Sequence, residues 1–274
     1  MKVTEIVSSA NQRLKIIRRL AEPGGTKDHP GNEDLFLLEG AKLIQEALDK
    51  KIELIDVIVS QTYFKDNFDG QKIANELDGI TVVQDRIFKG LYTTDTSCGI
   101  VATAKQKHYR LDEILSGALK SKTKLLLLGD NIQDPGNLGT IIRTAYAFQA
   151  GGLVLSKGSA DCYSPKVVRS SMGAIFGLPI ITRADLKLVI DKLKTCAFRV
   201  IALDNKAEKP FWLEISDKPK AYILGNEGHG ISPDILGLID STVSIPINPD
   251  CDSLNVAVAA GIILAQTQLR TTLD

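Results

Sequence analysis

Three short polar segments in the second half of the chain combine residue types that can bind a small ligand and act on it. They cover residues 134–143, 225–230 and 245–256, and an apolar run typical of a buried strand precedes or opens each of them. In open α/β sheets, ligands bind at the carboxyl ends of the strands, where segments of this kind lie. The sequence therefore predicts that the three segments line one pocket.

The third segment leads abruptly from a loop rich in proline and aspartate into a helix of small residues. Ser253 and Asn255 lie at the mouth of this helix, where serine, aspartate and asparagine cap free backbone N–H groups at about 1 kcal/mol each. The positive end of the helix dipole also faces whatever the loop encloses. Capping and ligand binding are compatible, because a side chain at a helix mouth can still turn toward a substrate oxygen.

The first segment places Arg143 six residues after Asn137, on a predicted helix whose other positions are mostly apolar or small. A surface arginine on an amphipathic helix is the common explanation for this pattern. The alternative is a clamp for a phosphate or carboxylate, because guanidinium presents a planar fork of donors.

The second segment, Gly225–Gly230, lacks the spacing of a dinucleotide fingerprint, and no GxxxxGK[ST] sequence occurs, so neither a Rossmann cofactor site nor a P-loop is predicted. Its glycines allow the backbone to approach a flat ligand closely. Glu227 could cap the turn, accept hydrogen bonds from a ribose or orient Arg143. His229 has the chemistry of a general base, but the sequence shows no partner for it, and we do not assign it that role.

Size and composition limit the classes of protein to consider. The 274 residues, 44% of them hydrophobic, can bury a large core and favour two domains. Lysine plus arginine and aspartate plus glutamate both number 33, so any nucleic-acid binding must use local patches. Four dispersed cysteines and three histidines without metal-ligand spacing predict reduced cytosolic thiols and no metal site. No apolar targeting or spanning segment follows Met1, which predicts a cytoplasmic protein that is neither exported nor embedded in a membrane.

Two basic segments are candidate RNA contacts. In residues 11–20, three aliphatic residues recur at helical spacing and four cations cover the remaining face, which predicts a basic amphipathic helix. Residues 105–110 form a basic, partly aromatic linker. A solvated helix face and an ordinary charged linker are the alternatives, and RNA binding that weakens with salt would favour phosphate contacts. The cations concerned are Arg13, Lys15, Arg18, Arg19, Lys105, Lys107 and Arg110.

Apolar runs and amphipathic segments alternate along the whole chain, which predicts an α/β fold. Residues 35–102 form a small α/β unit, and the later strands are near-continuous apolar runs, typical of a parallel sheet that is covered on both faces. The strands predicted after residue 120 are 124–128, 152–155, 199–203, 220–224 and 242–245. The helices predicted there are 137–148, 165–175, 185–195, 233–238 and 254–269.

Taken together, the polar segments resemble, in order, the three motifs of the TrmH/SpoU family of RNA ribose 2′-O-methyltransferases. The motif residues are Asn137 with Arg143, then Leu224–Gly228, then Ile245–Pro246 followed by Ser253–Val256. The segment Ser164–Pro179 resembles the family's connection between its first two motifs. Leu38–Gly40 and Ser97–Ala102 make the N-terminal half similar to the L30e-type substrate-binding domain of many members.

The resemblance implies a SPOUT fold, in which the C-terminal segment passes through a loop to form a deep trefoil knot that binds S-adenosylmethionine. It also implies a homodimer through the C-terminal domain. The domains would be an RNA-binding domain at 1–104, with a basic helix at 1–22 followed by the L30e-like part, a linker at 105–120 and a methyltransferase domain at 121–274. By position, the methyl-donor contacts fall on Leu224, Gly225, Asn226, Gly228, Ile245 and Leu254. The catalytic positions fall on Asn137, Arg143, Glu227, Ser253 and Asn255.

The reaction implied is methylation of a ribose 2′-hydroxyl in structured RNA, with 23S ribosomal RNA as the expected substrate. A guanidinium stays protonated at neutral pH, so we expect Arg143 to grip a phosphate and stabilise the forming alkoxide while the other polar residues orient the hydroxyl. Asn137 is expected to shape the turn and support this arginine, and the proton acceptor is left open. The alternatives are a transfer RNA substrate and a non-catalytic RNA-binding or ribosome-assembly protein that keeps the knot.

Overall fold

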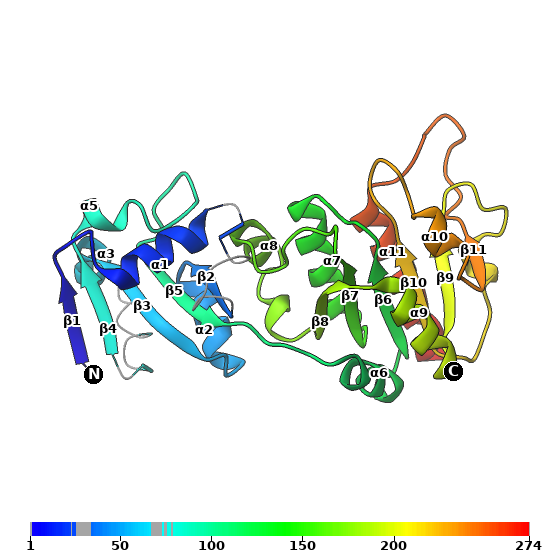
Figure 1. Cartoon of the computed structure of the whole chain (residues 1–274), viewed down its shortest axis with the longest axis horizontal. Coiled ribbons are helices and arrows are strands. Elements are labelled where there is room, and N and C mark those ends of the chain that lie inside the picture. Colours follow the sequence, from blue (N-terminus) through cyan, green and yellow to red (C-terminus); the bar gives the residue numbers. More distant parts are fainter. Residues whose placement is uncertain are drawn as a thin grey trace. The chain divides into compact units, whose positions relative to one another are not determined.

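The computed structural model describes residues 2–22, 24–25, 34–66, 73, 76–77 and 79–273. The chain forms two compact units, each with its own sheet (Figure 1). The first unit combines Met1–Lys107 with Asp161–Phe176, and the second combines His108–Ala160 with Gly177–Asp274. Residues 161–176 therefore fold with the first unit, although both neighbouring sequence motifs belong to the second.

The first unit contains a five-stranded mixed sheet in the order β1-β4-β3-β5-β2. The strands β1, β4 and β3 are parallel, and β5 is antiparallel to both β3 and β2. The strands are β1 (Lys2–Ile6), β2 (Leu35–Glu39), β3 (Leu54–Ser60), β4 (Gly79–Val83) and β5 (Ile100–Lys105). The helices are α1 (Gln12–Ala21), α2 (Ala41–Asp49), α3 (Gln61–Asp66), α5 (Asp85–Phe88) and α8 (Pro165–Ser170), with a short 3-10 turn η1 (Ala174–Phe176).

The predicted basic helix is confirmed as α1, but it occupies only part of segment 1–22, because residues 2–6 form the edge strand β1 beside β4. Leu14, Ile17 and Leu20 are fully buried against one face of the first sheet. The Asn11 side chain caps the helix by accepting a hydrogen bond from the Arg13 backbone N–H at 2.9 Å. Packing of this apolar stripe leaves the cationic face of α1 directed outward.

The second unit contains a six-stranded sheet in the order β11-β9-β10-β6-β7-β8, and every described strand pair in it is parallel. The strands are β6 (Leu125–Gly129), β7 (Gly152–Ser156), β8 (Ile180–Ala184), β9 (Arg199–Leu203), β10 (Lys220–Leu224) and β11 (Ser241–Val243). The helices are α6 (Leu111–Lys120), α7 (Pro135–Ala147), α9 (Leu186–Thr195), α10 (Pro233–Leu236) and α11 (Val256–Leu273), with a 3-10 turn η2 (Phe211–Leu213). The predicted parallel-sheet α/β architecture is confirmed.

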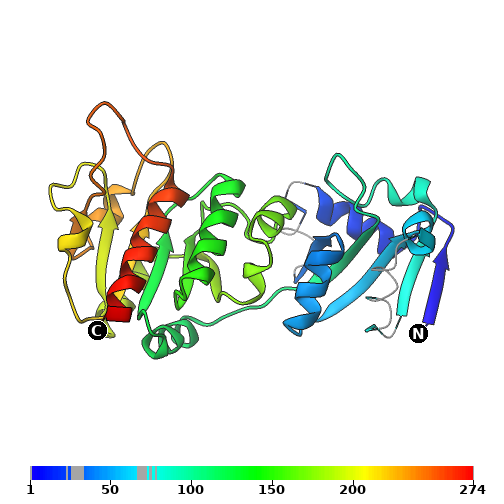
Figure 2. The same cartoon turned by 180° about the vertical axis from the view of Figure 1, so that it is seen from behind.

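Helices cover both faces of the second sheet, as its apolar strands require. Apolar residues of α6, α9 and α10 form one buried cluster with alternate residues of the strands. Figure 2 shows α7 and α11 side by side on the other face, where these two helices pack against each other. All five residues of β6 are buried, so this strand lies at the centre of the core.

Two features of the second half differ from the prediction. Strand β8 lies at the sheet edge, and its exposed residues Thr182 and Arg183 give it no apolar run. The helix predicted at 165–175 ends at Ser170, because Met172 and Gly173 adopt positive φ angles of 48° and 77°. The φ angle of Gly173 lies in the region that favours glycine, and a Cβ atom there would also force the Glu46 side chain to move, because its carboxylate oxygen would lie 1.8 Å away.

Polar and aromatic contacts hold residues 161–176 to the first unit. Arg169 forms an ion pair with Glu39, whose side chain is almost fully buried. The Tyr163 ring packs on Phe36 with centroids 4.9 Å apart, and its hydroxyl donates to the Lys107 carbonyl at 3.0 Å. In the part of the chain that the structure describes, every helix is too short or too polar to cross a membrane.

A buried carboxylate lies near the amino end of β9. Glu214 has a side chain that is 1% exposed, and it forms ion pairs with Arg199 and Lys209. Burial of this carboxyl raises its pKa, but the hydrogen bonds and charges of the two cations outweigh that effect and hold the pKa below its ordinary value. The ionised form is therefore favoured in the folded state.

Replacing Glu214 with glutamine should lower the free energy of unfolding by about 1–3 kcal/mol at neutral pH, because two cations lose their partner. Because the folded-state pKa is lowered, the carboxylate contributes stability that is fully present above the unfolded value of about 4.3 and is lost as the pH falls from there through the lower folded-state pKa. The difference in urea midpoint between wild type and Glu214→Gln should therefore shrink on acidification. The exposed neighbour Glu208, replaced by glutamine, is the control; an equal loss there would contradict the assignment.

Candidate functional site

A pocket with a volume of about 630 Å³ lies at the carboxyl ends of the neighbouring strands β11, β9, β10 and β6. All six residues predicted to bind the methyl donor line it, namely Leu224, Gly225, Asn226, Gly228, Ile245 and Leu254. Four of the five predicted catalytic residues also line it, namely Asn137, Glu227, Ser253 and Asn255. The structure thus brings together three segments that are far apart in the sequence.

The glycine-rich segment forms a tight turn directly after β10. Backbone hydrogen bonds of 2.9 Å join Asn226 and Gly230 in both directions and close the turn. A Cβ atom at Gly225 would lie 2.4 Å from the Gly230 carbonyl carbon, so the turn can close only with glycine at this position. The Asn226 side chain donates to the Asn131 carbonyl at 2.8 Å and ties the turn to the loop after β6.

A chain of side-chain amides and a carboxylate joins the three polar segments. The Asn255 amide donates to Oδ1 of Asn137 at 2.8 Å, and the Asn137 amide donates to Oε1 of Glu227 at 3.0 Å. Asn137 thus links the loops before α7 and α11 to the turn after β10. This arrangement confirms no role for these residues, but it fixes the positions of three predicted catalytic side chains relative to one another.

Backbone groups hold the Glu227 carboxylate in addition to Asn137. The N–H groups of Gln133 and Asp134 donate to it at 3.3 and 3.2 Å. Partial burial raises the pKa of Glu227, but these hydrogen bonds, with the one from Asn137, outweigh burial and hold the pKa below its ordinary value. The carboxylate therefore stays ionised at neutral pH and acts as an acceptor that organises the loops.

Two helix amino termini lie beside the pocket. Asp134 caps α7 by accepting from the Asn137 backbone N–H at 2.8 Å. Asn255 caps α11 by accepting from the Ala257 backbone N–H at 2.9 Å, so the cap of this helix is Asn255 and not Ser253. In the described part of the chain, the Ser253 hydroxyl makes no hydrogen bond, and Ser253 itself is exposed at the pocket.

Arg143 is the one predicted catalytic residue that does not line the pocket. It is exposed on α7, six residues beyond Asn137, which corresponds to about 9 Å along the helix axis. Among the described residues, no hydrogen bond or ion pair holds its guanidinium.

Sequence reasoning missed one wall of the pocket. Asp204, Asn205 and Lys206 follow β9 and line the pocket, and the Asn205 amide donates to the Asp252 carbonyl at 2.8 Å. A signal was present, because these polar residues follow a buried parallel strand as the other three segments do. His229 also lines the pocket, and its ring nitrogen Nδ1 lies 3.1 Å from Oδ1 of Asn226.

The part of the chain that forms this pocket matches a known protein family. A model of the SpoU rRNA methylase family matches residues 124–265, which include every residue of the three polar segments. The chain belongs to the SpoU rRNA methylase family. A model of the MRM3-like substrate-binding domain matches residues 11–102. The predicted class of enzyme, an RNA methyltransferase that uses S-adenosylmethionine, is confirmed at the level of this SpoU family.

Relatives and solved structures match nearly the whole chain. The chain is 32% identical over 265 residues to the 23S rRNA (guanosine(2553)-2′-O)-methyltransferase RlmP of Bacillus subtilis, a match that covers 95% of this chain and 97% of the relative. It is 29% identical over 319 residues to rRNA methyltransferase 3, mitochondrial, of Homo sapiens, with coverage of 95% and 73%. The AdoMet-bound rRNA methyltransferase from Sinorhizobium meliloti superposes with a TM-score of 0.81 at 26% identity, with 98% of each chain covered.

The residues of this SpoU pocket fit an adenosyl sulfonium ligand. Leu224, Ile245 and Leu254 supply apolar surface for a flat base, while the glycine turn and two helix amino termini supply backbone donors. The volume of the pocket lies within the range of about 300–1,000 Å³ that is usual for ligands of this size. Bound S-adenosylmethionine would supply an activated methyl group at this position.

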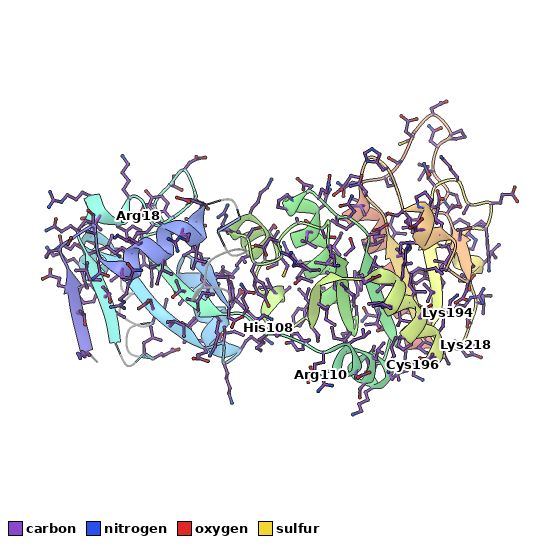
Figure 3. The ribbon with its side chains drawn as sticks, viewed as in Figure 1. Arg18, His108, Arg110, Lys194, Cys196 and Lys218 are labelled. Carbon is purple, nitrogen blue, oxygen red and sulfur yellow. The ribbon has the colours of Figure 1, made fainter. Side chains whose placement is uncertain are left out.

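The cations predicted to contact RNA differ in their surroundings. Arg13 forms an ion pair with Asp56, and Arg18 donates to the Ser9 carbonyl at 2.7 Å. Figure 3 shows Arg18 on α1 and Arg110 at the start of α6. Lys107 lies 3.4 Å from the Phe176 carbonyl, and Lys105 lies 3.5 Å from Glu53. Lys15 is exposed, and in the described part of the chain no ion pair neutralises it.

The bridge through Asn137 can be tested with the isosteric change Asn137→Asp. The new carboxylate would face Glu227 at the position of the present 3.0 Å hydrogen bond while still accepting from Asn255. Like charges at this distance repel, and they raise the pKa of the pair. The affinity for S-adenosylmethionine, measured by calorimetry, should fall by about tenfold or more near neutral pH.

The same affinity should recover in part as the pH falls to about 5, because protonation of the pair removes the repulsion. The matched control is Asn248→Asp, an exposed asparagine of the loop before α11 that does not line the pocket. Equal losses in the two variants, or a loss in Asn137→Asp that does not change with pH, would contradict the proposed bridge.

Proposed function

We propose that this SpoU protein transfers a methyl group from S-adenosylmethionine to a ribose 2′-hydroxyl of ribosomal RNA, with 23S rRNA as the substrate. The observation that carries the proposal is that Asn137, Glu227, Ser253 and Asn255 all line the donor pocket, where Asn137 is hydrogen-bonded to both Glu227 and Asn255. The Bacillus subtilis relative, which matches the chain over nearly its full length, acts, by its name, on a guanosine 2′-oxygen of 23S rRNA.

Different residues of the chain position the ribose hydroxyl and stabilise the charge that develops on its oxygen. The Ser253 hydroxyl and the amides of Asn137 and Asn255 orient the ribose hydroxyl in line with the methyl group, since positioning accounts for much of the rate in such a transfer. Arg143 grips the adjacent phosphate and stabilises the negative charge that develops on the ribose oxygen. Glu227 keeps Asn137 and the turn in place and does not itself take the proton, because its pKa is lowered.

The remaining parts of the proposal concern organisation. Residues 1–104 bind the RNA substrate, and residues 105–120, of which α6 packs into the second unit, lead to the methyltransferase domain at 121–274. That domain forms a homodimer and holds the trefoil knot. The match of an MRM3-like substrate-binding model to residues 11–102 supports the first role. Because the proposed substrate is ribosomal RNA, the reaction takes place in the cytoplasm.

The direct test is to incubate the protein with labelled S-adenosylmethionine and total RNA, and then to map modified riboses at single-nucleotide resolution. Label in 23S rRNA supports the proposal. Label in transfer RNA would show that transfer RNA is the substrate instead. Donor and RNA binding without transfer would show a binding protein of the same fold. Sedimentation of the protein in solution tests the dimer separately.

Arg143→Ala should lower the rate of methyl transfer by about 10²–10³-fold, because it removes a donor that stabilises charge in the transition state. Donor binding, measured by calorimetry, should stay nearly intact, since Arg143 does not line the pocket. Arg143→Lys should recover only part of the rate, because an ammonium lacks the planar fork of guanidinium. Loss of donor binding in Arg143→Ala would show the assignment to be wrong.

RNA affinity should fall as salt rises, and exposed cations without a partner should contribute most to this dependence. Lys15→Gln should reduce the slope of log affinity against log salt by about 0.7–0.9, the value for one lost phosphate contact. Arg13→Gln should change the slope less, because Asp56 already neutralises that cation. The control is Lys187→Gln on α9, where Asp234 pairs with the lysine. A slope that is the same in all variants would remove α1 from the RNA interface.

A further inference from the structure

His229 is a histidine in the glycine turn, and its partner in the structure determines the state of its ring. Its Nδ1 lies 3.1 Å from Oδ1 of Asn226. The orientation of the Asn226 amide follows from its other contacts, because its nitrogen faces the Asn131 carbonyl while Oδ1 accepts the backbone N–H groups of Gly228 and His229 at 2.9 and 3.0 Å. If the amide were flipped, its nitrogen would face the backbone N–H groups of Gly228 and His229, and its oxygen would face the Asn131 carbonyl oxygen.

With the orientation of the Asn226 amide fixed, a neutral His229 imidazole can adopt only one tautomer. Oδ1 of Asn226 can only accept, so Nδ1 of His229 carries the proton and donates. Nε2 then keeps its lone pair and is the basic atom of the ring. Because His229 is exposed and lines the pocket, this basic nitrogen is accessible to a substrate that enters there.

The other ionisable side-chain types of the pocket suit this role less well. Asp204, Lys206, Glu227 and Asp252 line the same pocket; a carboxylate is intrinsically a weaker base than an imidazole, and an ammonium has no lone pair with which to accept a proton. The Glu227 carboxylate already accepts three hydrogen bonds. In the loop after β6, the Asp130 carboxylate accepts from the Ser232 backbone N–H, and Asp134 caps α7. Among the described residues that line the pocket, His229 is the only histidine, so it alone offers an imidazole nitrogen as an acceptor.

We propose that His229 is the proton acceptor of the reaction, an assignment that rests on the function proposed above. The ribose oxygen forms a bond to the methyl carbon while the carbon–sulfur bond breaks and its electron pair stays on sulfur. The hydroxyl proton moves to Nε2, and the imidazolium later releases it to water. Asn226 is the positioning residue that keeps the basic nitrogen of the ring directed into the pocket.

The kinetic test uses His229→Gln, which keeps a donor toward Asn226 but has no basic nitrogen. Single-turnover methyl transfer should fall by about 10²–10⁴-fold, the usual contribution of a general base. The affinities for S-adenosylmethionine and RNA should not change. The wild-type rate should decline at acid pH as the imidazole is protonated, and the variant should lose this decline. The control is His108→Gln at the other described histidine, labelled in Figure 3, which should keep the acid decline.

A second measurement needs no turnover. Nitrogen chemical shifts of the His229 imidazole in the free protein should show a protonated Nδ1 and a bare Nε2. A proton on Nε2, a wild-type rate in His229→Gln, or a variant that is slower but keeps the acid decline would each overturn the proposal. Failure of the wild-type protein to methylate any RNA would instead overturn the proposed function, so the two failures are distinguishable.

Discussion

The side-chain amide of Asn137 is the contact on which the arrangement of the site depends. Its nitrogen donates to Glu227 and its oxygen accepts from Asn255, so one planar group joins three loops that follow different strands. An amide is suited to this position because it presents a donor and an acceptor in a fixed geometry. Glu227 in turn accepts hydrogen bonds from the backbone N–H groups of Gln133 and Asp134. The carboxylate that accepts from Asn137 therefore also shapes the loop that leads to Asn137.

Much of the fold could be predicted because parallel strands buried on both faces leave a clear pattern. Strand β6 is a run of four leucines and a glycine, and Lys220–Leu224 was predicted with the bounds that the structure shows. The pocket could be predicted for a related reason, since polar segments that follow parallel strands must meet at one edge of the sheet. Ten of the eleven donor and catalytic residues that the family resemblance implied line this pocket, and Arg143 lies outside it.

The features that were not predicted depend on contacts between distant residues. Strand β8 has an exposed edge, so hydrogen bonding to β7 defines it more than its own residues do. The helix predicted at 165–175 ends at Ser170, and Gly173, in the turn that follows, lies beside Glu46, a residue more than a hundred positions earlier. The state of His229 depends on the Asn226 amide, whose orientation depends in turn on the Asn131 carbonyl. A linear sequence shows none of these pairings.

Asn255 shows how capping and site organisation can share one side chain. Its oxygen caps α11 at the Ala257 backbone N–H, and its nitrogen donates to Asn137, so both ends of the amide have fixed partners. A serine at this position would also supply an acceptor for the helix cap. Its one hydroxyl group, however, is too short to cap the helix and donate to Asn137 at the same time, whereas an amide has separate acceptor and donor atoms. With the capping role filled by Asn255, the exposed Ser253 hydroxyl is available for a substrate oxygen at the pocket. Division of the two roles between neighbouring residues therefore lets the helix stay capped whether or not a substrate is present.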